Sequence, residues 1–60
     1  MNRYIVYYRM NTDMEWSDEY YPAPYIPADN ANEALKTATD YIYELGYDAS
    51  KYEYMVVYYE

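Results

Sequence analysis

A helix with a marked start and a marked end lies in the middle of the sequence, and it constrains the fold more than any other feature. Asn30 and Glu33 have the spacing of a capping box, in which side chains near the first turn bond to backbone N–H groups. Gly46 follows Leu45, and glycine readily adopts the left-handed conformation that ends a helix. These signals predict a helix over residues 31–45.

The predicted helix is amphipathic. At about 100° per residue, its small and apolar residues fall on one face and its charged residues on the opposite face. Tyr43 projects near the charged face, so we expect its ring to be exposed. The face expected to be buried consists of Ala31, Ala34, Leu35, Ala38, Ile42 and Leu45, and the face expected to be solvated of Asp29, Glu33, Lys36, Asp40 and Glu44.

Segments rich in tyrosine, valine and isoleucine precede and follow the helix, and they predict β-strands over residues 3–10 and 51–59. Residues 14–21 alternate in polarity and predict a second strand. Residues 25–28 are consistent either with a short extra strand or with an extended approach to the helix.

A turn cluster at residues 11–13 joins the first two predicted strands and indicates a hairpin. A shift of one residue would place Glu15, Ser17 and Glu19 against the apolar side of the first strand, so burial favours the unshifted register. In that register Met10 lies opposite Met14, Tyr8 opposite Trp16, Val6 opposite Asp18 and Tyr4 opposite Tyr20.

The order of elements is therefore ββαβ, and the last strand is expected to pair antiparallel with the first. A right-handed connection places the helix on one face of the sheet. The sequence predicts an α+β fold with an antiparallel sheet of order 2-1-3 and one amphipathic helix packed on one face. Sixty residues form a single domain, residues 1–60.

The residues that most often carry catalysis are missing. The chain has no histidine or cysteine and only one glycine, so it lacks the usual general base, the strongest nucleophile and a glycine-rich phosphate loop. Asn11, Asp13 and Glu15 alternate like the first ligands of a calcium loop, but Trp16 replaces the required glycine. We expect a protein without enzymatic activity, cofactor or metal.

Thirteen tyrosines and no phenylalanine indicate surfaces that are partly wet. Such rings are frequent at interfaces, and they are also good fillers of β-sheets. An apolar patch occupies the other face of the sheet if the face under the helix consists of Tyr4, Val6, Tyr8, Met10, Tyr52, Tyr54, Val56 and Tyr58. We expect this patch to bind a second copy of the chain, and its residues are Ile5, Tyr7, Met55, Val57 and Tyr59.

Eleven acidic and four basic residues give a net charge of −7, which disfavours nucleic acid and anionic membranes as direct partners and favours a basic protein. The helical residues Glu33, Asp40 and Glu44, with Tyr43 beside them, suggest an alternative role. They could mimic nucleic acid and inhibit a basic nucleic-acid-binding protein, or simply form a solvated face.

No apolar run resembles a secretion signal or a membrane span, so a cytoplasmic protein is expected.

Overall fold

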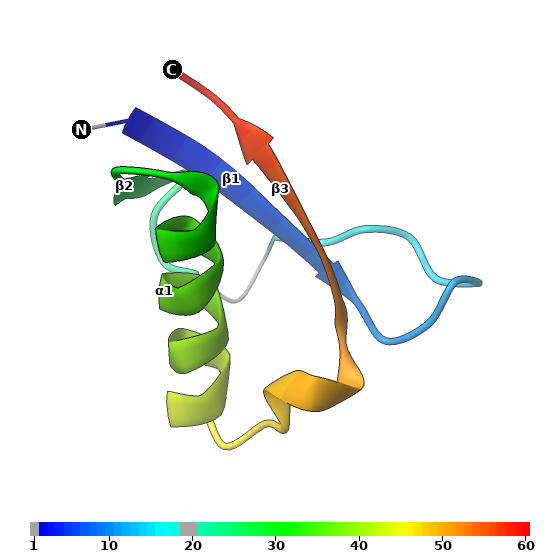
Figure 1. Ribbon diagram of the computed structural model, residues 1–60. Helices are drawn as coiled ribbons and strands as arrows, with labels where there is room; N and C mark the ends of the chain where they lie inside the picture. The colour runs from blue at the N-terminus through cyan, green and yellow to red at the C-terminus, as the bar shows by residue number, and fades with distance from the viewer. Residues whose placement is uncertain (1, 19–20) are drawn as a thin grey trace.

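The computed structural model describes residues 2–18 and 21–60. In these residues the chain forms three strands, one α-helix and a short 3₁₀ helix. They are β1 (Asn2–Arg9), β2 (Ile26–Ala28), α1 (Ala31–Glu44), η1 (Ala49–Lys51) and β3 (Glu53–Tyr58). Figure 1 shows α1 lying against one side of the strands, with η1 leading from the helix into β3.

The sheet has the order β2-β1-β3, and both strand pairs are antiparallel. The central strand pairs Tyr4 with Ile26 of β2 on one side and with Tyr58 of β3 on the other. These observations confirm the predicted α+β fold, the sheet order 2-1-3 and the single helix on one face.

The segment that supplies the second strand is not the predicted one. Residues 14–18 form only an isolated bridge, in which Ser17 lies opposite Tyr8. The expected pairing of Tyr8 with Trp16 is therefore wrong by one residue, and the pairing of Tyr4 with Tyr20 lies outside the described residues. The turn itself is present, because the N–H of Asp13 donates to Oδ1 of Asn11 at 2.9 Å.

Burial explains why residues 26–28 take the place beside β1. Ile26 and Ala28 are 2% and 5% exposed, and they alternate with the exposed Pro27. The predicted strand would instead have brought the carboxylate of Asp18 against Val6, at a cost that the buried pair of β2 avoids. Only two residues separate β2 from α1, so the same short segment starts the helix over the sheet.

The start of α1 follows the sequence prediction. The side chain of Asn30 accepts a hydrogen bond from the N–H of Glu33 at 2.9 Å. The carboxylate of Glu33 accepts in return from the N–H of Asp29 at 3.2 Å, one residue before the expected position. The first bond satisfies one of the backbone donors that the first helical turn leaves without partners, and the second fixes the residue that precedes the cap.

The helix ends as the glycine indicates. Gly46 has a φ of +93°, a conformation that other residues adopt only with strain. Its N–H donates to the carbonyl of Tyr43 at 3.0 Å, and the N–H of Tyr47 donates to the carbonyl of Ile42 at 3.3 Å. This pair of bonds is the Schellman motif, which ends α1 at Glu44 with Leu45 as its cap.

The core lies between α1 and the inner face of the sheet. Its buried side chains are Tyr4, Val6, Tyr8, Ile26, Ala28, Ala34, Ala38 and Ile42. Leu35 packs against this core but is only partly buried. The prediction was wrong for Ala31 and Leu45, which are exposed at the first residue and at the C-cap of the helix.

The ends of the strands also leave apolar residues outside the core. Met10 was expected under the helix, but β1 ends at Arg9 and Met10 is 54% exposed. Tyr58 was expected there too and is 61% exposed, because α1 only partly covers β3. Half-buried Tyr54 and Val56 complete the inner face at that strand.

Candidate functional site

The outer face of the sheet, which α1 does not cover, carries the patch predicted from the sequence. The register of β1 and β3 sets Ile5 opposite Val57 and Tyr7 opposite Met55, so the four side chains form a continuous apolar block. Met55 and Val57 are 37% and 39% exposed, and Tyr59, just beyond β3, is 55% exposed. Ile5 and Tyr7 on the central strand are half-buried. We call these five residues the outer-face patch.

One end of the outer-face patch is bordered by Arg9. Its Nε lies 2.9 Å from Oε2 of Glu53, the residue paired with it across the sheet. Its guanidinium carbon also lies 4.0 Å from the centroid of the Trp16 ring, a cation–π distance. The charge at this border is thus neutralised within the chain.

The other end has the same construction. Arg3 forms an ion pair with Glu60, and its guanidinium carbon lies 4.9 Å from the centroid of the Tyr25 ring. The ring of Tyr25 stacks on that of Tyr59, with centroids 5.7 Å apart and planes 13° from parallel. The patch therefore lies between two arginines that each contact a carboxylate and an aromatic ring.

Two residues of this surface, Trp16 and Tyr25, were not assigned to it from the sequence. Trp16 was expected opposite Tyr8 on the helix side, but the bridge to Ser17 shifts the register by one residue and so reverses the face. Tyr25 reaches the surface because it directly precedes β2. If residues 26–28 are taken as the second strand, their alternation places Tyr25 on the outer face of the sheet.

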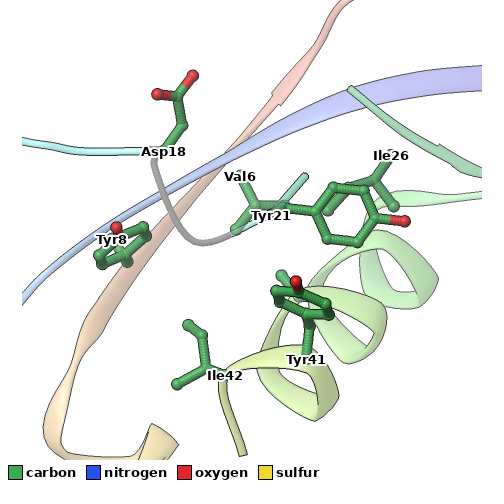
Figure 2. A pocket seen from close by; sticks show the side chains of 8 residues that line it. Val6, Tyr8, Asp18, Tyr21, Ile26, Tyr41 and Ile42 are labelled. Atoms are coloured by element: carbon green, nitrogen blue, oxygen red, sulfur yellow. The ribbon is translucent and has the colours of Figure 1, made fainter. Parts of the chain in front are cut away.

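The inner side of the sheet offers little space for a ligand. Figure 2 shows the gap between α1 and the sheet, where Tyr21 and Tyr41 face one another. Their rings meet edge to face, with centroids 5.4 Å apart. The enclosed volume is only about 10 Å³, which admits nothing larger than a water molecule.

The second predicted surface, the charged face of α1, is exposed as expected. Tyr43 is 76% exposed, and Glu33, Asp40 and Glu44 all face solvent. Part of their charge is already engaged. Nζ of Lys36 lies 3.8 Å from Oδ2 of Asp40, and the carboxylate of Glu33 caps the helix.

Two other classes of feature are absent from the part of the chain that the structure describes. Over residues 2–18 and 21–60, no group of three or more histidine, cysteine, aspartate or glutamate residues is arranged to hold a metal ion. Over the same residues, no helix has the length and apolar character needed to cross a membrane.

Comparison of the chain with models of protein families, with curated proteins and with solved structures gives no match. Any functional conclusion therefore depends on the surface chemistry of this chain alone.

Proposed function

We propose that this protein is a non-enzymatic binding module that associates with a second copy of itself through the outer-face patch. The observation that carries the proposal is the pairing of Ile5 with Val57 and of Tyr7 with Met55 on the face that lacks a helix. Apolar surface of this kind, with a charged border, is typical of interaction sites.

The charges around the outer-face patch support the same proposal. Covering an unpaired charge during association costs free energy, because the charge loses its water. Arg3 and Arg9 already have carboxylate and aromatic partners within the chain. A second copy can therefore cover the patch without leaving a lone arginine buried.

The size of the domain gives self-association a physical benefit. A chain of about 60 residues buries only about 60% of its unfolded surface, and its core supplies about 3–5 kcal/mol of stability. There is no cysteine to form a disulfide. Association adds stability by mass action, because a second copy binds only the folded chain.

Sedimentation velocity at several concentrations tests this function. We expect the wild-type chain to sediment as a dimer at high micromolar concentration and the double variant Tyr7→Ser/Val57→Ser as a monomer that keeps its far-ultraviolet circular dichroism. The matched control is Tyr43→Ser/Leu45→Ser, which removes an exposed tyrosine of α1 and the exposed leucine that caps this helix, neither of which belongs to the outer-face patch. A monomeric wild-type chain at that concentration contradicts the proposal.

A second candidate function rests on the exposed charges of α1. Asp40 and Glu44 lie one helical turn apart with the exposed Tyr43 between them in sequence, and a carboxylate row of this kind could occupy a basic nucleic-acid site. If this function is correct, the chain captures basic nucleic-acid-binding proteins, and added salt weakens the capture. Duplex DNA should also displace the chain from these proteins. Asp40→Lys/Glu44→Lys should abolish the capture and leave the cap at Glu33 intact. Capture that survives these substitutions argues against the inhibitor function.

A further inference from the structure

The two edges of the sheet are built differently. The edge at β2 is protected. On the central strand, the carbonyl of Arg3 accepts from the N–H of Tyr59 at 2.8 Å, so the backbone groups of Arg3 point towards β3 and away from β2. Pro27 lies opposite Arg3, and its backbone therefore faces away from β1, towards the open edge. Proline has no N–H to offer there. This edge is also short, with three residues in β2.

The edge at β3 has no such protection. Because the N–H of Tyr59 faces β1, alternation along the strand turns the backbone groups of Tyr54, Val56 and Tyr58 outward. In the part of the chain that the structure describes, no strand pairs with this side of β3 (Figure 1). The strand contains no proline, and the carboxylate of its single charged residue, Glu53, is paired with Arg9. An apolar edge without a proline or a free charge is a template for strand pairing.

We infer that β3 pairs edge to edge and antiparallel with β3 of a second copy, around a two-fold axis at Val56. The inference rests on the proposed self-association and places its contact at the edge of the outer-face patch. Two copies joined at β3 bring Met55 and Val57 together and leave Ile5 and Tyr7, on the central strand, uncovered. Residues 54–58 read Tyr-Met-Val-Val-Tyr, which is nearly symmetric in size and polarity about Val56. This symmetry points to a second copy as the partner, because an isologous contact sets the same strand against itself.

The axis at Val56 uses every outward-facing backbone group of β3. Tyr54 then lies opposite the partner's Tyr58, and Val56 opposite the partner's Val56, with hydrogen bonds exchanged at each pair. An axis at Met55 would pair Tyr58 with the partner's Tyr52, outside β3. An axis at Val57 would pair Tyr54 with the partner's Glu60, whose backbone already bonds to Arg3.

The same register suits the side chains. On the outer face, Met55 lies opposite the partner's Val57, so the two outer-face patches join at the seam. Glu53 lies opposite the partner's Tyr59, and no like charges face one another across the seam. The charged residues of α1 are exposed, and the helix lies against one face of the sheet (Figure 1), so they do not belong to the strand edge that forms the contact.

Single cysteines test the register directly, because the natural chain has none. In the proposed pairing, the Cα atoms of two Val56→Cys residues lie about 5.5 Å apart, which suits a disulfide. Two Val57→Cys residues are offset diagonally by about 7–8 Å, beyond the reach of a disulfide. We expect mild oxidation to convert most of the Val56→Cys variant, and little of the Val57→Cys variant, into a covalent dimer.

A second pair of variants tests the hydrogen bonds. Val56→Pro removes the outward N–H at the centre of the edge, whereas Val56→Ala shortens the same side chain and keeps the N–H. We expect association of the proline variant to be at least about tenfold weaker than that of the alanine variant. Circular dichroism checks the fold, and the cysteine pair decides the question if the proline variant does not fold.

These experiments distinguish failure of self-association from failure of edge pairing alone. A wild-type chain that stays monomeric overturns both the self-association and the edge pairing. A dimer that cross-links through Val57→Cys rather than Val56→Cys, and that tolerates Val56→Pro, overturns edge pairing alone. In that case the two copies stack through their outer faces and the proposed function stands.

Discussion

The guanidinium group of Arg9 lies against the ring of Trp16, with 4.0 Å between the guanidinium carbon and the ring centroid. This contact attaches the segment after the first turn to the end of β1, next to the backbone bridge between Tyr8 and Ser17. It also fixes one border of the outer-face patch.

A double-mutant cycle measures this contact. We expect Arg9→Ala and Trp16→Ala to be coupled by about 0.5–1 kcal/mol in urea unfolding, the usual range for a cation–π pair at a partly exposed site. The control cycle combines Arg9→Ala with Tyr43→Ala, which should be additive within about 0.3–0.5 kcal/mol. Equal additivity in the two cycles would show that the Trp16 contact contributes nothing to stability.

The buried face of α1 is most sensitive at Ile42, which is 2% exposed. Ile42→Ala should lower the free energy of unfolding by about 2–5 kcal/mol and Ile42→Val by about 0.5–1.5 kcal/mol, because each leaves a cavity under the helix. The neighbouring Tyr43→Ala should change it by less than about 0.5 kcal/mol, since its ring is in solvent. Urea titrations in which Ile42→Ala resembles wild type would mean that this face is not the packed one.

The helix cap gives a third prediction. Asn30→Ala should cost about 1 kcal/mol of stability, because the N–H of Glu33 loses its side-chain acceptor. Asn30→Asp keeps an acceptor at the same place and should retain most of that stability. The matched control is Asn32→Ala. Asn32 is the second residue of α1 and is exposed, so its replacement should not destabilise the chain. Thermal and urea unfolding of the three variants show whether the stability lost in Asn30→Ala comes from the cap. An equal loss in Asn32→Ala would mean that it comes from replacing an asparagine at either position.

A fourth prediction concerns acid titration before η1. Hydrogen bonds from the hydroxyl of Ser50, at 2.6 Å, and from its backbone N–H, at 3.0 Å, lower the pKa of Asp48 below its ordinary value. A carboxylate whose pKa is lower in the folded than in the unfolded chain stabilises the fold above the unfolded pKa, about 3.9. That contribution is lost as the pH falls through the folded pKa.

Ser50→Ala should therefore raise the pKa of Asp48 towards its ordinary value, and Ser50→Thr should preserve the lowered pKa. The stability difference between wild type and Ser50→Ala should shrink as the pH falls below about 4. Carboxyl carbon resonances followed by nuclear magnetic resonance report the titration directly. An unchanged Asp48 pKa in the alanine variant would assign the shift to the backbone N–H of Ser50 and the charge of Lys51.

Local signals in the sequence determined the helix and the two long strands. The bond between Asn30 and Glu33 and the positive φ of Gly46 involve residues within a few positions of one another, so composition and spacing were enough to place α1. The apolar alternation of β1 and β3 likewise identified Ile5, Tyr7, Met55 and Val57 as one face.

Only the tertiary structure decided which segment became the second strand and which face Trp16 joined. Residues 14–21 have the better strand pattern over a longer stretch, whereas residues 26–28 form a three-residue strand with a proline at its centre. The short segment pairs with β1 because Ile26 and Ala28 are buried under α1, while Asp18 stays exposed. Strand propensity is a local property, but the free energy of burying a side chain depends on what covers it, and here that cover is a helix that begins only three residues after β2.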